Sequence, residues 1–326
     1  MSAGVVQLIA IGAQDEYIMG NPEISFFSSH FKRHANFSQS NEKQTILGAV
    51  KSNSMSSVNF ERSGDLLGYV YFAADDSSQA QSIDDWRTLV DKVELLIGGS
   101  VVDTQDSIFS EKIAIDTFAQ NVSKSAMGPH PGTSSSSYFY PLRFFFCESA
   151  QSAIPLVALN YHNVELRIYW GPNASAYNIE CFANYYYIDT QERAQISKKT
   201  HDILITQVQK NIPSQTRIQE LTFNHPVKYI ASSNTSVVSS LTSPSNKIKL
   251  TINGLDVGNY RWSQPHFIDV MNYYHTNFVT SPDFFLYCFC LMTSSYQPTG
   301  TLNFSRLNSA KIMSESLDIM DPIYAV

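Results

Sequence analysis

The residues best suited to metal chemistry lie near the N-terminus, in the stretch QDEYIMGNPEISFFSSHFKRHANF (14–37). His30 and His34 are four residues apart, so a helix would place both imidazoles on one face. A zinc metalloprotease helix also needs a Glu directly after the first His, and Phe31 stands at that position. The pair therefore favours a surface or interface role over a metal site.

Thiol chemistry is the second candidate. The chain has four cysteines, Cys147, Cys181, Cys288 and Cys290, which are too few for a disulfide scaffold. Cys288 and Cys290 are two apart in FFLYCFCLM, a spacing that puts both thiols on one face of a strand. Paired zinc ligands usually have two to four residues between them. The pattern predicts buried free thiols and a reducing compartment, and no metal.

Hydrolase and nucleotide-binding patterns are missing from the sequence. It contains no G-x-S-x-G elbow and no Gly-rich phosphate loop. The acidic pairs Asp75–Asp76 and Asp84–Asp85 fall in polar loops, where solvated carboxylates are commoner than catalytic ones. His162 and His225 each border a predicted strand, as hydrogen-bonded structural histidines do. The sequence thus predicts no catalytic residue, no cofactor and no enzyme activity.

Five glycosylation sequons occur, at Asn36, Asn121, Asn173, Asn234 and Asn303. The N-terminus lacks the basic start of a secretory signal, so these sequons are expected to arise by chance in a chain rich in Ser and Asn. No run reaches the 18 apolar residues of a membrane span. These observations predict a soluble, intracellular protein.

The composition of the chain indicates which kinds of molecule it can bind. Of 326 residues, 43% are hydrophobic, 13% aromatic and only 16% charged, with a net charge of −7. Binding to phosphates needs clustered Lys and Arg, and the sequence shows no such cluster, so direct nucleic-acid binding is not expected. A charge-poor, aromatic-rich surface suits broad contacts with other subunits.

Short strands dominate the elements that would hold any site. Stretches rich in β-branched and aromatic residues alternate with polar turns, which predicts a β-sandwich or barrel. The expected strands include 66–74, 91–103, 137–146, 163–170, 181–189, 201–209, 227–233, 246–254 and 284–292. Two helices are expected, over 107–119 with Ser107 as its cap and over 189–200. We place a domain boundary at about residue 195, which leaves two halves that each have roughly the length of an eight-stranded jelly roll.

Seven segments follow one another along the chain in an order that suggests a family. The first is GAQDEYIMGNPEISFFSSHFKRHANF (12–37). The others are VELLIGGSVVD (93–103), YPLRFFFCESAQSAIPLVALNYHNVELRI (140–168), YYIDTQERAQ (186–195), FNHPVK (223–228), LTINGLD (250–256) and QPTGTLNFSR (297–306). Together they resemble the double jelly-roll major capsid proteins of nucleocytoplasmic large DNA viruses.

The resemblance implies an all-β fold of two consecutive eight-stranded antiparallel jelly rolls with few short helices, over 23–195 and 196–326, after an N-terminal arm of residues 1–22. It also implies a homotrimer of pseudo-hexagonal outline that tiles the icosahedral shell of a large double-stranded DNA virus. Neighbouring capsomers and minor capsid proteins would be its partners. The virion capsid would be its location, assembled in the host cytoplasm and close to an inner membrane that the chain does not cross.

On this resemblance the histidine-containing stretch is a structural arm and an assembly contact. Its candidate contact residues are Gln14, Asp15, Tyr17, Gly20, Asn21, Pro22, Lys32, Arg33 and His34. We expect Ile24, Phe26 and Phe27 to begin the first strand and its core.

The chain departs from the family pattern in three places. It is short, which predicts small surface loops, and its inter-domain segment QERAQISKK (191–199) has few arginines. The final IYAV (323–326) would only begin the strand that closes the second jelly roll, which predicts an open sheet edge there.

Two alternatives remain open. The short length of the chain leaves open a minor or penton-type capsid component, although pentons usually have one jelly roll. A glycan-binding β-sandwich would use exposed aromatics in loops, and the candidates for that role are Tyr138, Tyr140, Tyr273 and Tyr274.

Overall fold

The computed structural model describes residues 12, 15–29, 31–76, 78–118, 137–233, 240–277 and 284–326. The chain has two parts, residues 1–36 and a compact body formed by residues 37–326. The first part contains the short helix α2 (Glu16–Met19), which ends where the Gly20 N–H donates to the carbonyl of Glu16 over 2.9 Å. Asn21 follows in the left-handed conformation, with φ of 54°. Gly20 and Asn21 thus form the turn that their residue types predict.

The expectation that Ile24, Phe26 and Phe27 start the first strand is wrong. Their side chains are 67%, 92% and 101% exposed, and the first strand, β1, begins only at Phe37. Strand β1 reads FSQSNEKQ and buries Gln44 alone, because it lies at the edge of its sheet. A search for alternating apolar residues passes over such a polar edge strand.

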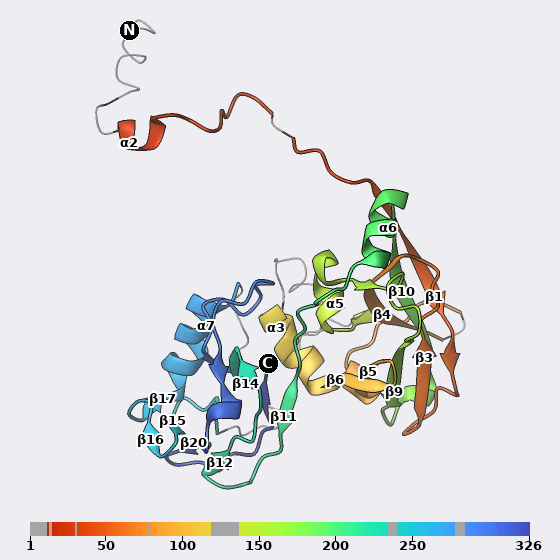
Figure 1. Cartoon of the computed structure of the whole chain (residues 1–326). Coiled ribbons are helices and arrows are strands. Elements are labelled where there is room, and N and C mark those ends of the chain that lie inside the picture. Colours follow the sequence, from red (N-terminus) through yellow and green to blue (C-terminus); the bar gives the residue numbers. More distant parts are fainter. Residues whose placement is uncertain are drawn as a thin grey trace, which may run out of the picture. The chain divides into compact units, whose positions relative to one another are not determined.

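The first half of the body is a sandwich of two antiparallel sheets (Figure 1). One sheet has the order β1 (Phe37–Gln44), β10 (Asn178–Ile188), β4 (Leu66–Asp75) and β7 (Phe139–Pro141), with β8 (Ile154–Pro155) also paired to β4. The other has the order β2 (Ile46–Leu47), β3 (Met55–Asn59), β9 (Val164–Trp170), β5 (Val90–Ile97) and β6 (Ser100–Asp106). Alternate residues of both sheets fill the core between them, as in β9, where every second side chain is buried.

Short helices connect the strands of the first half. They are η2 (Trp86–Thr88), η3 (Phe109–Ile113), α3 (Ala114–Phe118), α5 (Phe145–Glu148), η4 (Ala150–Ser152) and η5 (Ala174–Ala176). Helix α6 (Thr190–Lys198) then leads towards the second half. The two predicted helices are therefore confirmed, whereas the strand expected over 137–146 stops at Pro141 and α5 follows it.

The second half repeats the sandwich with shorter strands. One sheet has the order β11 (Gln209–Asn211), β21 (Ile323–Ala325), β14 (Tyr229–Ser233) and β18 (Phe284–Cys288). The other has the order β12 (Ile218–Glu220), β20 (Ala310–Ser314), β15 (Lys247–Ile252) and β16 (Leu255–Asp256), with β17 (Arg261–Trp262) also on β15. A two-stranded ribbon, β13 (Pro226–Val227) with β19 (Leu302–Asn303), and the helices η6 (Ser263–Val270), α7 (Met271–His275) and η7 (Phe304–Arg306) complete this half.

The predicted strand over 201–209 is also wrong, since strand pairing starts only at Gln209. Residues 201–208 have no regular secondary structure, and Ile203, Leu204 and Ile205 are all at least 38% exposed. The run is apolar but lacks a sheet partner, so its β propensity is not realised.

The final strand β21 lies inside its sheet and leaves no open edge. Its backbone pairs with β11 on one side, from Gln209↔Ala325 to Asn211↔Ile323, and with β14 on the other. The prediction of an exposed edge at IYAV is therefore wrong, because β11 covers that side of the strand.

Two tight turns explain the glycine-punctuated strand endings in both halves. Gly98 and Gly99, between β5 and β6, have φ of 61° and 82°, and Asn253 and Gly254, between β15 and β16, have φ of 51° and 79°. Two successive positive φ values define the type I′ turn, whose twist matches that of a two-residue hairpin. The same turn therefore occurs once in each sandwich.

Candidate functional site

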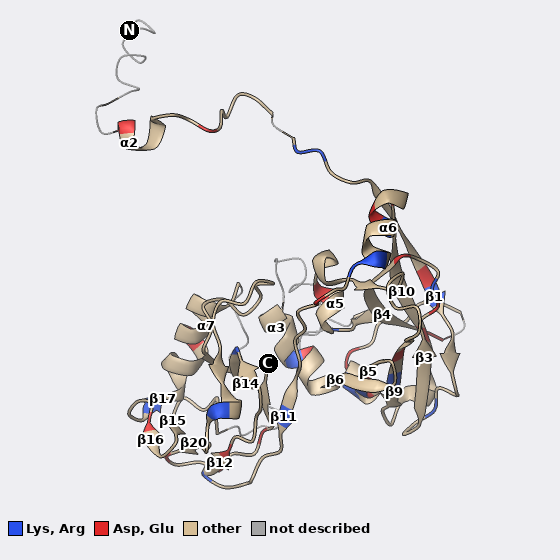
Figure 2. Ribbon diagram, in the orientation of Figure 1, with Lys and Arg blue, Asp and Glu red and all other residues tan. Residues whose placement is uncertain are grey.

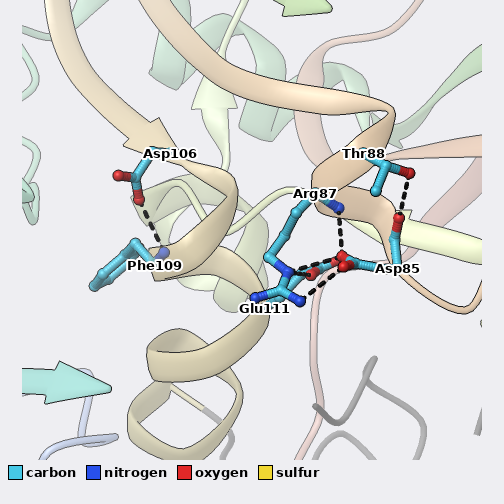
Figure 3. A network of polar contacts seen from close by, with 6 residues as sticks. All are labelled: Asp85, Arg87, Thr88, Asp106, Phe109 and Glu111. Carbon is cyan, nitrogen blue, oxygen red and sulfur yellow. Dashed lines mark hydrogen bonds and ion pairs between the residues drawn. The ribbon is translucent and has the colours of Figure 1, made fainter. Parts of the chain in front are cut away.

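The candidate site is the junction where the two sandwiches meet, and its central element is the helical segment η3–α3. Asp106, the last residue of β6, accepts a hydrogen bond through Oδ1 from the backbone N–H of Phe109 over 2.9 Å (Figure 3). This bond satisfies one of the free N–H groups at the start of a helix. Asp106 therefore caps the segment, and the predicted cap, Ser107, is one residue too late.

A second set of polar contacts ties η3 to the first sandwich (Figure 3). Asp85 holds the Arg87 guanidinium through two bonds of 2.7 Å, from Nε to Oδ1 and from Nη2 to Oδ2. The same Arg87 Nε lies 3.3 Å from Oε2 of Glu111, on η3. Arg87 thus joins η2, the short helix before β5, to η3, and its planar guanidinium binds the Asp85 carboxylate through two parallel bonds.

The electrostatics of Glu111 follow from this arrangement. Its side chain is buried, and burial raises the pKa of Glu111 to about 8. The negative charge of Asp85 also raises it, while Arg87 opposes the shift. Near neutral pH the protonated form of Glu111 therefore predominates, which is the less costly form for a buried carboxyl.

The far face of η3–α3 packs on the second sandwich. Phe109, Ile113, Ala114 and Phe118 share one apolar cluster with side chains of the other half. The partners from the second half are Tyr229, Ala231, Phe284, Leu286, Cys290, Tyr324 and Val326. Figure 1 shows the C-terminal end of the chain beside α3. The two halves are thus held by a continuous apolar contact as well as by their linker.

Hydrogen bonds beside this apolar cluster also connect the two halves. Oδ2 of Asp106 accepts bonds from Tyr324 Oη, over 2.7 Å, and from Lys210 Nζ, over 2.6 Å. Asp103, three residues earlier on β6, accepts a hydrogen bond from the backbone N–H of Val208 over 2.9 Å. Burial raises the pKa of Asp103 to about 6, against the effect of its hydrogen bonds. One strand, β6, therefore supplies two carboxylates that bind the second half.

Sequence reasoning missed these junction residues. Asp106, Arg87, Glu111 and Tyr324 lie far apart in the chain, and no local motif unites them. One signal was available: an acidic residue just before an apolar helical stretch is a common helix cap. The bridging role of Asp106 could not be found without the strand order of the second half.

The predicted arm contacts all belong to the part of the chain before Phe37. Asp15 accepts a bond from the backbone N–H of Gly12 over 2.8 Å. Tyr17, Gly20, Asn21 and Pro22 are exposed, as are Lys32, Arg33 and His34. Gln14 and His30 lie outside the described residues, so the His30–His34 pair has no geometry to assess.

Other predicted residues have separate locations. Asn36, Asn173 and Asn303 are exposed, and Asn121 and Asn234 lie outside the described residues. All four cysteines are free thiols. Of the pair predicted to be buried, Cys290 is buried and Cys288 only partly so. Cys181 is also buried, and Cys147 is partly buried.

The aromatic residues proposed for glycan binding divide into two groups. Tyr138, Tyr273 and Tyr274 are exposed, and the rings of the last two meet edge to face at 4.9 Å. Tyr140 is only 2% exposed and stacks on Phe72 within the core of the first sandwich. Tyr140 is therefore unavailable to a glycan, because its ring faces the opposite sheet.

Charged and metal-binding residues show no concentrated site in the part of the chain that the structure describes. Lys and Arg lie scattered among Asp and Glu (Figure 2). Within the same described ranges, no three His, Cys, Asp or Glu side chains gather where they could hold a metal ion. Nor does any described helix have the length and apolarity needed to cross a bilayer.

Comparison with known proteins connects this architecture to a family. Residues 25–199 match the family described as "Major capsid protein N-terminus", and residues 192–318 match "Large eukaryotic DNA virus major capsid protein". The chain belongs to the major capsid proteins of large eukaryotic DNA viruses. It is 29% identical to the major capsid protein of Pyramimonas orientalis virus, over 98% of this chain and 93% of the relative. It is 28% identical to that of Paramecium bursaria Chlorella virus 1, over 96% and 87%.

Solved structures agree with this assignment at the level of the fold. The capsid protein in a quasi-atomic model of the PBCV-1 capsid aligns with a TM-score of 0.76 and 23% identity, over 92% of this chain and 95% of that one. The Faustovirus major capsid protein aligns with a TM-score of 0.63 and 12% identity, over 97% and 92%. The two sandwiches are therefore the two jelly rolls of a double jelly-roll capsid protein, and the predicted fold class is confirmed.

Proposed function

We propose that this major capsid protein forms a homotrimer of pseudo-hexagonal outline, which tiles an icosahedral shell together with neighbouring capsomers and minor capsid proteins. Three chains supply six similar jelly rolls, and six similar units can approximate six-fold packing. The observation that carries this proposal is the junction around η3–α3. The junction holds the two jelly rolls of one chain together through an apolar cluster and through the hydrogen bonds that Asp106 accepts from Tyr324 and Lys210. The two jelly rolls can therefore assemble as one unit.

The role is structural and needs no catalytic centre. The relatives are capsid proteins by description, and the most perturbed carboxyl of the junction, Glu111, is buried and in contact with Arg87. We place the finished protein in the virion capsid and its assembly in the host cytoplasm, close to an inner membrane. Direct contact with the genome is not part of the proposal, since the basic residues are scattered.

The assembly arm in this proposal runs to residue 36, past its expected end at residue 22, because the first strand begins only at Phe37. The two jelly rolls then follow over 37–195 and 196–326. The contacts would be made by Tyr17, Asn21, Lys32, Arg33 and His34, whose side chains are exposed, and by Asp15, which is partly exposed. Apolar side chains in the same part of the chain, such as Ile18 and Phe27, are also exposed and suit burial against another subunit.

Light scattering after size exclusion, combined with electron microscopy of the purified protein, tests the trimer. We expect three chains per particle at micromolar concentration, and the same mass in 1 M salt, because apolar burial is not screened as surface ion pairs are. Images should show particles with a six-sided outline. A stable monomer in moderate salt would contradict the proposal.

A further inference from the structure

A cavity of about 690 Å³ opens at the junction of the two jelly rolls, beside the apolar cluster of η3–α3. Its volume lies within the usual range for small-molecule sites, roughly 300–1,000 Å³. Both jelly rolls and the linker between them contribute apolar walls, which include Phe118, Phe145, Leu204, Ile205, Val227 and Tyr296. Leu204 and Ile205 belong to the apolar run 203–205, which forms no strand. Two residues of that run therefore line the cavity instead of pairing in a sheet.

The charges on the cavity wall are uneven. Glu148 lines it, but its carboxylate lies 3.3 Å from Nη1 of Arg143, which balances its charge. Lys228 also lines the cavity, and its ammonium donates to the carbonyl of Thr293 over 3.3 Å. Among the described residues, no carboxylate lies within ion-pair distance of Lys228.

Lys228 therefore has hydrogen-bonding capacity to spare, since an ammonium carries three donors. Burial lowers the pKa of Lys228, which reflects the cost of a cation away from water. His225 is the remaining titratable group on the wall that could carry positive charge, and it is exposed. A ligand that matches this cavity would combine an anionic group, to pair with the Lys228 ammonium, with an apolar part, to cover the apolar walls.

We propose that this cavity binds a fatty-acid-like amphiphile, with its anionic head at Lys228 and its chain along Phe145, Leu204 and Ile205. Ser294 and Ser295 are also among the lining residues, and a serine hydroxyl can donate to an anionic oxygen. The ligand would bridge both jelly rolls at the place where η3–α3 already joins them. This site does not rest on the proposed trimer, because the described residues that line it all belong to one chain.

Calorimetric titration of the purified full chain tests the site with three twelve-carbon probes: dodecanoate, dodecanol and dodecyltrimethylammonium, each below its micelle concentration. We expect dodecanoate to bind most tightly and the cationic probe least. Lys228→Met should weaken dodecanoate binding about tenfold or more, the usual effect of losing a bond to a charged group, and leave dodecanol unchanged. Thr206→Trp, which adds bulk to the wall, should weaken both.

Lys247→Met is the matched control, since Lys247 is paired with Glu315 on a sheet of the second jelly roll and does not line the cavity. It should leave all three affinities unchanged. Equal binding of dodecanoate and dodecanol to the natural chain, equal effects of the two lysine substitutions, or no binding at all would each overturn the proposal. If Lys228→Met does not fold, acetylation of the natural chain decides: dodecanoate should protect Lys228 from the reagent, as read by peptide mass spectrometry, and an unprotected Lys228 would refute the site.

Discussion

Tyr324 donates a hydrogen bond from its hydroxyl to Oδ2 of Asp106 over 2.7 Å, although 218 positions separate the two residues. Tyr324 belongs to β21 in the second jelly roll, and Asp106 ends β6 in the first. The same carboxylate caps η3 and binds Lys210. The Asp106 carboxylate thus accepts hydrogen bonds from the first turn of η3, from Lys210 on β11 and from Tyr324 on β21. It is therefore a central polar contact between the jelly rolls.

Replacing Tyr324 by Phe removes this bond and keeps the buried ring. We expect the free energy of unfolding to fall by about 1.5–3 kcal/mol, the usual range for a hydrogen bond to a charged group. Denaturant titration measures the change. Tyr161→Phe serves as the control because Tyr161 is 94% exposed, and it should change the stability by less than about 0.5 kcal/mol. Equal effects of the two substitutions would show that the Asp106 bond contributes nothing.

Glu111→Gln tests the buried carboxyl of the junction. The pKa of Glu111 is raised to about 8 in the folded chain, from an ordinary 4.5. Between these values the folded chain holds a proton that the unfolded chain has released, so stability falls as pH rises and the loss ends near pH 8. Gln cannot titrate, so the stability of the variant relative to the natural chain should increase from pH 5 to pH 8, by up to about 1.4 kcal/mol per pH unit.

Unfolding curves at pH 5, 6, 7 and 8 measure this difference. Glu315→Gln provides the comparison, because Glu315 is a solvent-exposed partner of Lys247. Its curve should run nearly parallel to that of the natural chain. A constant offset between Glu111→Gln and the natural chain at every pH would mean that Glu111 is ionised throughout.

The sequence predicted those elements whose local pattern matches their final environment. Strand β9 alternates buried and half-buried residues, and β5 ends in a Gly-Gly turn, so both were found from periodicity and turn chemistry. Strand β1 was missed because an edge strand can be almost wholly polar, and 201–209 was misassigned because an apolar run can line a cavity without pairing.

The junction could be predicted least. Its polar contacts depend on which strand lies beside β21, and strand order is a property of the whole chain. The apolar contacts of the junction could be predicted in part, because the sequence placed Ile113 and Phe118 on one helix. Nothing local indicated that this helix packs on a second sandwich.

Gly98→Ala and Gly99→Ala form a matched pair in the β5–β6 turn. Both positions have positive φ, so Ala should cost about 1–2 kcal/mol at either. A Cβ at Gly98 would also lie 2.8 Å from Nδ1 of His162, whereas a Cβ at Gly99 meets no atom within 4 Å. Gly98→Ala should therefore destabilise more. Adding His162→Ala should reduce the difference in unfolding free energy, and an unchanged difference would mean that His162 is not its cause.

Deleting residues 1–20 separates folding from assembly. Among the residues that the structure describes, every member of the apolar cores lies within 37–326, so the truncated chain should keep its melting temperature and its trimer. Assembly into larger particles should weaken, because the proposed arm contacts of Asp15 and Tyr17 are lost. Light scattering measures the trimer, and electron microscopy counts shells or sheets. A truncated chain that stays monomeric would show that the arm belongs to the trimer itself.

Ile323→Ala tests whether the last strand closes the second jelly roll. Ile323 is fully buried in the core of that half, and its strand is paired on both sides. Truncating a buried Ile to Ala usually costs about 2–5 kcal/mol, since it removes apolar contacts and leaves a cavity. Ile212→Ala is the control: Ile212 lies just after β11 and is 76% exposed, so its loss should cost less than about 0.5 kcal/mol. Denaturant titrations of both variants should differ accordingly. A small and equal effect would show that β21 is only loosely held, and that something other than β11 must cover the sheet.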